Sequence, residues 1–291
     1  MLRRRTKALV IGLSLLLAGW LGLAANPAGA CTLFGLAGPE VAGGGTILVK
    51  NRDWRPNQTQ ELRLATPKGG YRYLGLFATG DAASGLKAGV NEAGLSAVTA
   101  TAASIPREER KAERGMGGIL RRLLTECGSV AEAVTRVDLF AQAKPCFFML
   151  ADRHEIARIE TAPGGRFAVT HTARGALRQT NHYLEPSLAD ANKTVGASSR
   201  TRAGRIEQLL ETVEKPAGLE AMLALSHDRA SGPDDSVFRT GSRPASVHTM
   251  AVFAVAMPPE GTGTLSLRTL DPDAPERVQT VVLDAAAFAK R

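Results

Sequence analysis

A cysteine directly after a small-residue motif is the strongest chemical feature of this sequence. Ala28-Gly29-Ala30 precedes Cys31, and an A-x-A motif is typical of the site at which a signal peptidase cuts. Cleavage after Ala30 would leave Cys31 as the first residue, with a thiol and an α-amine on the same residue. Because an α-amine has an unperturbed pKa of about 7.7–8.0, it can take the thiol proton near neutral pH. The position therefore predicts an N-terminal cysteine nucleophile.

The residues before Cys31 predict export from the cytoplasm. A basic start, an apolar stretch over residues 8–25 and a helix-breaking Pro27 are the parts of a secretory signal peptide. We expect residues 1–30 to be removed and residues 31–291 to form one catalytic domain, periplasmic or secreted. Two alternatives stay open. The apolar stretch is just long enough for an uncleaved membrane anchor, and lipoprotein signals also end at a cysteine, which is then acylated.

Apolar runs separated by turn-forming residues predict the elements that must position this cysteine. Strand signals occur in two groups with helical patterns between them, and no linker or repeat divides the chain, which indicates a mixed sheet-and-helix fold. Residues 106–114 carry charges of both signs and are expected to form a solvated loop. The expected strands cover 31–37, 46–49, 61–65, 73–78, 95–101, 146–150, 154–161, 166–172, 248–256 and 263–269, and the expected helices cover 117–126, 129–138, 200–213 and 217–226.

Composition and charge exclude several classes of protein. With 44% hydrophobic and 22% charged residues, the chain is neither disordered nor a coiled coil, and its single long apolar run excludes a polytopic membrane protein. The net charge of +8 falls to +4 once the four basic residues of the first 30 are removed, so no nucleic-acid partner is expected. The five histidines are scattered, so we expect no metal and no cofactor. Whether Cys127 and Cys146 form a disulfide is left open.

Four motifs in a fixed order resemble one group of enzymes. They are Cys31-Thr32, Lys50-Asn51-Arg52-Asp53-Trp54, Val90-Asn91-Glu92-Ala93-Gly94-Leu95 and Thr180-Asn181-His182. The chain resembles the N-terminal-nucleophile (Ntn) hydrolases that include choloylglycine hydrolases, penicillin V acylases and penicillin acyltransferase-like (C45-type) enzymes. The resemblance implies an α+β fold, a four-layer αββα sandwich with antiparallel sheets. It also implies cleavage or transfer at a linear amide.

The resemblance further implies roles for single residues. Cys31 would be the nucleophile, and Asp53 would accept hydrogen bonds from its α-amine. Asn181 would donate its side-chain N–H to the developing oxyanion. Arg200 would support the thiolate or bind substrate. The structural alternatives are a turn or capping residue at Asp53, an Asx-turn residue at Asn181 and an exposed helical residue at Arg200.

Two positions depart from the family pattern. Lys50 stands where the family usually has arginine, and it keeps the charge but lacks the guanidinium fork. Arg52, two residues on, would face the same side of a regular strand and could take over that role. Thr101, ten residues after Asn91, stands where choloylglycine hydrolases have an asparagine of the oxyanion hole, which argues against bile-salt cleavage. Thr101, Asn91 and Arg52 are therefore secondary candidates for contacts with the substrate or its oxyanion.

Together these features predict an exported cysteine Ntn amidohydrolase that cleaves a small-molecule acyl amide through a Cys31 thioester. Within the same class, the alternative is an acyltransferase that passes the acyl group to an amine acceptor. From another class, the alternative is an exported lipoprotein that only binds ligands and is anchored through an acylated Cys31. A membrane partner is expected only for such an anchor or an uncleaved signal, and a homo-oligomer is left open.

Overall fold

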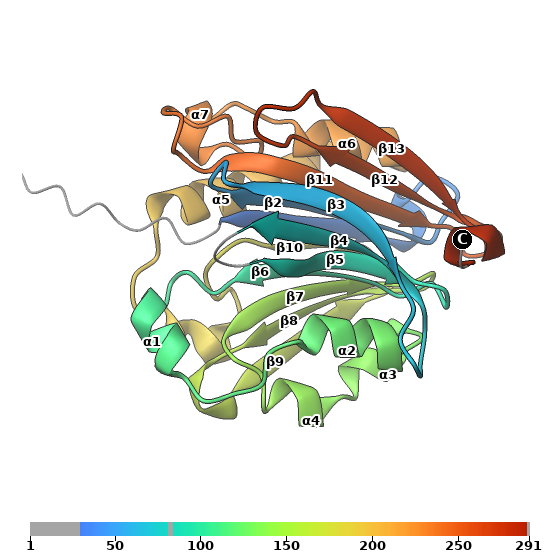
Figure 1. The fold of residues 1–291 in the computed structure, drawn as a ribbon, viewed down its shortest axis with the longest axis horizontal. Helices are drawn as coiled ribbons and strands as arrows, with labels where there is room; N and C mark the ends of the chain where they lie inside the picture. The colour runs from blue at the N-terminus through green and yellow to red at the C-terminus, as the bar shows by residue number, and fades with distance from the viewer. Residues whose placement is uncertain (1–29, 81–83, 290–291) are drawn as a thin grey trace, which may run out of the picture.

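Two antiparallel β-sheets lie face to face, with helices on the outer face of each (Figure 1). The computed structural model describes residues 30–80 and 84–289. The predicted signal peptide lies outside these residues except for Ala30. The order of layers is helix, sheet, sheet, helix, which confirms the predicted α+β four-layer αββα sandwich.

The six-stranded sheet carries Cys31 at the start of one of its inner strands. Its order is β10 (Gly175–Gln179), β1 (Cys31–Ala37), β2 (Thr46–Trp54), β11 (His248–Met257), β12 (Gly263–Thr269) and β13 (Arg277–Leu283). A turn with glycines at 43, 44 and 45, all at positive φ, lies between β1 and β2, and glycine adopts this conformation without steric cost. In the resulting hairpin, Cys31 pairs with Arg52. The nucleophile predicted from the sequence therefore lies beside segment 50–54 of β2, which carries the second of the four motifs.

The seven-stranded sheet is a meander in which each strand pairs with the next one along the chain. Its order is β3 (Gln58–Ala65), β4 (Tyr73–Gly80), β5 (Gly85–Asn91), β6 (Ser96–Thr101), β7 (Cys146–Ala151), β8 (Ile156–Thr161) and β9 (Phe167–Thr172). β5 and β6 pair only at Ala88–Val98, Gly89–Ala97 and Val90–Ser96, although both strands extend farther. The ladder between them therefore ends before it reaches Lys87 and Thr99.

Helices cover both outer faces of the sandwich. The α-helices are α1 (Arg107–Ala112), α2 (Ile119–Glu126), α3 (Val130–Val134), α4 (Val137–Phe140), α5 (Ala197–Thr212), α6 (Leu219–Ser226) and α7 (Gly232–Asp235), and the 3₁₀ helices are η1 (Gly38–Glu40), η2 (Pro163–Gly165), η3 (Pro186–Ala191) and η4 (Ala285–Phe288). α2, α3 and α4 contribute to a cluster with the seven-stranded sheet, and α5 and α6 to one with the six-stranded sheet. Among the described residues, no helix is both long and apolar enough to cross a membrane.

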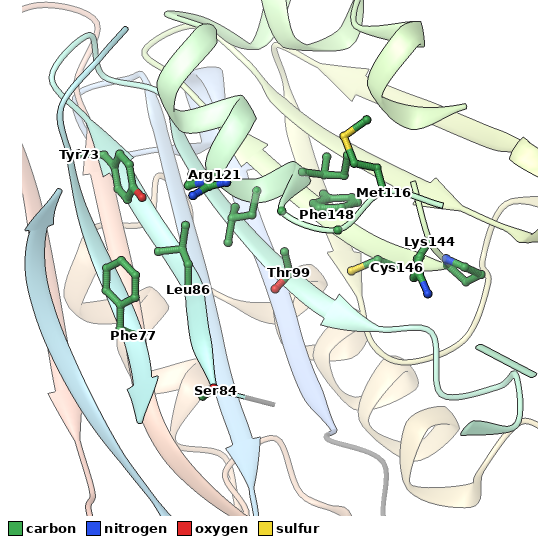
Figure 2. A pocket seen from close by; sticks show the side chains of 15 residues that line it. Tyr73, Phe77, Ser84, Leu86, Thr99, Met116, Arg121, Lys144, Cys146 and Phe148 are labelled. Carbon is green, nitrogen blue, oxygen red and sulfur yellow. The ribbon is translucent and has the colours of Figure 1, made fainter. Parts of the chain in front are cut away.

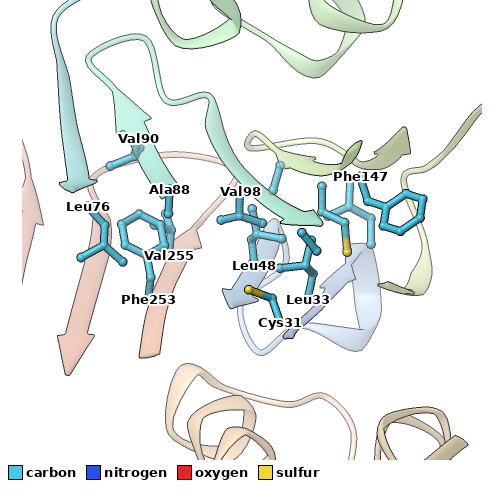
Figure 3. Packing of buried hydrophobic residues seen from close by; sticks show 14 of the residues in the cluster. Cys31, Leu33, Leu48, Leu76, Ala88, Val90, Val98, Phe147, Phe253 and Val255 are labelled. Atoms are coloured by element: carbon cyan, nitrogen blue, oxygen red, sulfur yellow. The ribbon is translucent and has the colours of Figure 1, made fainter. Parts of the chain in front are cut away.

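Three apolar clusters fill the three interfaces between the layers. The cluster between the two sheets contains Cys31, Leu33, Phe147 and Phe253 (Figure 3). Because alternate residues of a strand face opposite sides, Leu33 packs between the sheets while the next residue, Phe34, packs under the helices. Cys31 follows the same alternation, so its side chain points between the sheets and is 5% exposed.

Most predicted elements are present, and the differences have local causes. β5, β10 and β13 were not predicted: β5 contains two glycines, β10 has five residues, and β13 is a largely exposed edge strand whose apolar residues do not mark a core face. The predicted helix over 129–138 is interrupted at Thr135 and Arg136, between α3 and α4. The expected loop over 106–114 is wrong in part, because it contains α1, whose acidic first turn and basic last turn suit the helix dipole.

Candidate active site

A small cavity at the start of β1 brings together residues from both sheets. Its volume is about 90 Å³. It is lined by Cys31, Lys50, Arg52, Trp54, Lys87, Thr99, Ala100, Thr101 and Cys146. Lys50 and Arg52 both face it, as their two-residue spacing on a strand predicts. Three basic side chains and no carboxylate line this cavity in the described part of the chain, and burial lowers the pKa of one of them, Lys87, to about 7. The electrostatic potential of the cavity therefore favours an anion or a developing negative charge.

Lys50 is buried between the sheets and binds backbone rather than solvent. Its side chain is 1% exposed, and Nζ donates hydrogen bonds to Lys87 O at 2.8 Å and Thr99 O at 2.6 Å. These two carbonyls lie where the next rung of the β5–β6 ladder would form. Burial lowers the pKa of Lys50 to about 8, against the opposing effect of the Cys31 side chain. Lys50 therefore links the six-stranded sheet to both strands at the point where their pairing ends.

Arg52 places a guanidinium beside the nucleophile. It donates to the carbonyl oxygen of Asp53 at 2.6 Å and to Gln58 Oε1 at 2.8 Å, and it lies 4.8 Å from the Trp54 ring centroid. Burial lowers the pKa of Arg52, while charge and hydrogen-bond interactions with the Cys31 side chain act in the opposite direction. The planar group that Lys50 lacks is thus present two residues farther along the same strand.

Asn181 lies just after β10 and contacts the backbone of Cys31. Its Oδ1 accepts a hydrogen bond from Cys31 N at 3.1 Å and another from Arg202 Nη2 at 2.9 Å. Because arginine can only donate, the atom that faces Arg202 must be the amide oxygen. Nδ2 therefore points the other way and donates to Thr101 O at 3.0 Å. The contact of Thr101 with Asn181 is thus made by the Thr101 backbone carbonyl. Thr101 also lines the cavity that contains Cys31.

Arg202 on α5 is the functional residue that the sequence analysis missed. It is 1% exposed and donates to Cys31 O at 2.8 Å, to Thr32 Oγ1 at 2.9 Å and to Asn181. Burial lowers the pKa of Arg202 to about 10, with Asp53 opposing. Arg200, the predicted residue, is exposed and donates to Val195 O at 2.6 Å, outside this cluster.

Helical spacing distinguishes these two arginines. The buried residues of α5 are Ser199, Arg202, Ala203, Ile206 and Leu210, which recur three and four residues apart along one face. Arg200 falls outside this pattern. The apolar positions at 203, 206 and 210 were visible in the sequence, so extending their periodicity backwards would have indicated Arg202.

Asp53 lies on the opposite face of β2 from the cavity. It is fully buried, and Thr249 Oγ1 donates to its Oδ1 at 2.9 Å. Within residues 30–80 and 84–289, Asp53 Oδ2 has no hydrogen-bond partner. Burial raises the pKa of Asp53 to about 6, against the charges of Arg239 and Arg202. Cys31 N, still joined to Ala30 in this chain, donates to Asn181 rather than to Asp53.

Asn91 is buried at the far end of β5 and organises a turn. Its Nδ2 donates to Leu124 O at 3.0 Å and to Cys127 O at 2.8 Å, and its Oδ1 accepts from Ala93 N and Leu95 N. The two donated bonds tie the β5–β6 turn to the end of α2, and the two accepted bonds lie within the turn. Asn91 does not line the cavity around Cys31, so the structure places it apart from the other predicted residues.

A larger cavity adjoins the first one beneath α2. Its volume is about 550 Å³, and Thr99 and Cys146 line both cavities (Figure 2). Burial raises the pKa of Cys146 to about 11, so this thiol stays protonated at neutral pH. Cys31, Cys127 and Cys146 are all free cysteines. In the described segments, no group of three or more His, Cys, Asp or Glu side chains is arranged to hold a metal ion.

Comparison with solved structures supports the fold. Conjugated bile acid hydrolase from Clostridium perfringens, as a single-residue variant, superposes with a TM-score of 0.53 at 14% identity, covering 87% of this chain and 92% of that one. The N-acylethanolamine-hydrolyzing acid amidase orthologue of Caenorhabditis elegans gives a TM-score of 0.50 at 13% identity, covering 79% and 94%. At these identities, the likeness concerns the fold alone.

Sequence comparison identifies the family. No curated protein matches the chain. The sequence model of the acyl-coenzyme A:6-aminopenicillanic acid acyl-transferase family matches residues 41–269, which is most of the chain. The chain therefore belongs to this family, and it is an enzyme of the N-terminal nucleophile type that acts on linear amides.

Proposed function

We propose that the protein, once processed to begin at Cys31, hydrolyses a linear acyl amide through a Cys31 thioester. One observation carries the proposal: the backbone of Cys31 is fixed on both sides while its side chain lines a cavity. Asn181 accepts from Cys31 N, and Arg202 donates to Cys31 O. Because Arg202 also binds Asn181, these contacts form one connected network. A nucleophile that is held in this way attacks from a defined direction.

The reaction proceeds in two halves. In the first, the α-amine takes the thiol proton and the sulfur attacks the amide carbon. Negative charge develops on the substrate oxygen, near the Asn181 side-chain amide and the Arg52 guanidinium, which stabilise it. The C–N bond then breaks, and the leaving nitrogen takes the proton from the α-amine. In the second half, water adds to the thioester carbon while the α-amine takes one of its protons, and the acid leaves as the Cys31 thiol re-forms.

Removal of Ala30 is necessary for this chemistry. An amide nitrogen at Cys31 has no basic lone pair, and in the unprocessed chain it donates to Asn181 Oδ1. After cleavage the same nitrogen becomes an amine that can accept a proton. Asp53 supports this step in the proposal, because its Oδ2 is a buried carboxylate oxygen without a hydrogen-bond partner in the described residues. A new ammonium group would supply that partner.

The experiment compares two forms of the protein on the same amides. One form begins at Cys31, and the other retains Ala30; each is incubated with acetyl and octanoyl amides of 7-amino-4-methylcoumarin. We expect fluorescence release only from the form that begins at Cys31. Cys31→Ser should lose most of this activity, because a hydroxyl is far less ionised than a thiol. Cys127→Ser, which removes a buried thiol outside the cavity, is the matched control and should keep it.

Intact mass spectrometry gives the second readout. Acid quenching during turnover should show one acyl group added to the processed protein, on the peptide that contains Cys31. Activity of a sequence-verified chain that retains Ala30, or an acyl group on another residue, would contradict the mechanism.

Acyl transfer is a second candidate, and the family match favours it. The thioester is the same, and only the nucleophile that resolves it differs. Adding hydroxylamine or an amino acid to the assay distinguishes the two. A hydrolase should release mainly the free acid, whereas a transferase should form the new amide at the expense of the acid.

We also propose that residues 1–30 direct export and are then removed. The basic, apolar and A-x-A segments of the sequence support this, and the mass of the protein recovered from the periplasm or medium tests it. A free Cys31 supports the enzyme, whereas a diacylglyceryl addition to Cys31 supports the lipid-anchored alternative.

A further inference from the structure

We propose that the cavity beneath α2 binds the acyl part of the substrate, and that Tyr73 and Arg121 at its far end bind a terminal carboxylate on that acyl group. The preferred substrates are then monoamides of medium-chain dicarboxylic acids. This inference rests on the proposed function, because it takes Cys31 as the nucleophile.

The two cavities meet at two side chains that line both of them. Thr99 and Cys146 line both the cavity of Cys31 and the cavity beneath α2. They lie where the β5–β6 ladder has ended and Lys50 Nζ bridges the carbonyls of Lys87 and Thr99. In this proposal, an acyl group attached to Cys31 passes the side chains of Thr99 and Cys146 to enter the larger cavity.

The larger cavity suits an apolar chain along most of its length. Its lining includes Phe77, Leu86, Met116, Leu120 and Phe148, and its volume of about 550 Å³ lies within the range of small-molecule sites. No carboxylate belongs to the lining in the described part of the chain. An apolar body with a negative charge at one end would match both features.

The far end of the cavity offers two hydrogen-bond donors. Tyr73 is 3% exposed and lines the cavity, and its hydroxyl has no hydrogen-bond partner within residues 30–80 and 84–289. Tyr73 and Arg121 both line the cavity, and in Figure 2 both side chains lie away from Cys146. Burial raises the pKa of the Tyr73 phenol, and the positive charge of Arg121 acts in the opposite direction.

Arg121 differs in its contacts from the next residue of α2. Arg122 donates two hydrogen bonds to the Glu126 carboxylate, at 2.7 and 3.0 Å, and does not line the cavity. Arg121 lines the cavity and, among the described residues, forms no ion pair with a carboxylate. Arg121 is exposed, and its guanidinium and the Tyr73 phenol together provide donors for one carboxylate. Arg122 therefore provides a matched control for the loss of one positive charge from the same helix.

The register of the strands gives the length of the acyl group. Thr99 Oγ1 donates to Lys87 O, so these two residues mark the end near the nucleophile. Tyr73 pairs with Asn91, four residues farther along β5. Four residues of a strand span about 13 Å. The Tyr73 ring leans back along β4 toward Gly75, where a Cβ would lie 3.2 Å from Tyr73 Cε2, so the span to its hydroxyl is shorter than this register distance. An extended octanedioyl group, which measures roughly 9 Å between its terminal carbons, probes the shortened span.

The test uses three amides of 7-amino-4-methylcoumarin with the processed protein: acetyl, octanoyl and octanedioyl. We expect kcat/KM for the octanedioyl amide to exceed that for the octanoyl amide by about tenfold or more, as a charge-assisted hydrogen bond provides. Arg121→Gln should remove this preference, and Tyr73→Phe should reduce it. Arg122→Gln should leave it within about twofold of wild type. Leu86→Trp, which fills the cavity, should lower kcat/KM for both long amides but not for the acetyl amide.

Direct binding separates this inference from the proposed function. Titration calorimetry with octanedioate and octanoate measures the subsite without turnover, and octanedioate should bind more tightly to wild type but not to Arg121→Gln. Equal affinities, or equal effects of Arg121→Gln and Arg122→Gln, would overturn the subsite even if the acetyl amide is cleaved. Absence of cleavage of all three amides would instead refute the proposed function, while the binding result still decides the subsite.

Discussion

The guanidinium of Arg202 donates a hydrogen bond of 2.8 Å to the carbonyl oxygen of Cys31. This contact joins the helical layer to the first residue of β1 through the face of the sheet that is opposite the cavity. The Cys31 side chain is on the other face, among the cations of β2. Arg202 therefore holds the Cys31 backbone from the helix-covered face of the sheet, while Arg52 lies beside the Cys31 side chain on the cavity face.

Replacement of Arg202 by lysine should reduce turnover because lysine keeps the charge but cannot bind Cys31, Thr32 and Asn181 at once. We expect kcat/KM to fall by about 100-fold, the size of effect that a small displacement of reacting groups produces. Arg200→Lys on the exposed side of α5 is the matched control and should stay within about twofold of wild type. A larger loss in Arg200→Lys than in Arg202→Lys would return the role to Arg200.

Ser199 should act on the reaction through Asn181. Its Oγ accepts a hydrogen bond from Asn181 N at 3.0 Å and lies 2.8 Å from His182 Nδ1. Ser199→Ala removes both contacts and leaves a buried amide unsatisfied, so Asn181 should shift. We expect kcat to fall about tenfold with little change in KM. Thr212→Ala, which removes a hydroxyl that donates to Gln208 O at 2.8 Å near the other end of α5, controls for general loosening of this helix.

A rise in KM with kcat unchanged would show that Ser199 does not position the oxyanion-binding amide of Asn181. The pH profile of kcat should also keep its shape, because Ser199 does not titrate.

The resemblance of four motifs to a known family predicted the layers. Strand alternation predicted that Lys50 and Arg52 lie on one side of β2, and the A-x-A motif indicated Cys31 as the candidate nucleophile. The partners that arrive from distant segments could not be predicted in the same way. The Lys50 ammonium binds backbone carbonyls of β5 and β6. Every residue has a backbone carbonyl, so no residue type in the sequence indicates this contact. Only the assembled sheets reveal that contact.

Asn91 is a residue for which the motif match was misleading. The match suggested a contact with the substrate or its oxyanion, whereas in the structure Asn91 stabilises a turn. Asn91→Ala removes four hydrogen bonds, two that hold the β5–β6 turn against the end of α2 and two within the turn. We expect a loss of about 2–4 kcal/mol in the free energy of unfolding, with kcat of the remaining folded protein unchanged. Urea denaturation and active-site titration with iodoacetamide measure the two quantities separately. A stable Asn91→Ala protein with low kcat would restore Asn91 to the site.

Asp53 provides a pH-dependent test of the contact with the α-amine. In the chain that retains Ala30, burial raises the pKa of Asp53 from its ordinary 3.8 to about 6. Between about pH 4 and 6, the folded chain then binds more protons than the unfolded chain. Stability from this group is therefore fully present below about pH 4 and is lost as pH rises through 6. The size of the change is about 3 kcal/mol.

Processing should abolish this dependence if Asp53 binds the new amine. An ammonium at Cys31 favours the ionised carboxylate and lowers its pKa, so the folded and unfolded chains then bind protons alike between pH 4 and 6. Urea unfolding of both forms and of their Asp53→Asn variants, at pH 4, 5, 6 and 7, measures the difference. We expect the wild-type chain with Ala30 to lose stability relative to Asp53→Asn as pH rises, and the processed chain to show no such loss. The same loss in both forms would mean that Asp53 does not contact the amine, since a buried carboxylate without a new partner has no reason to change its protonation on cleavage.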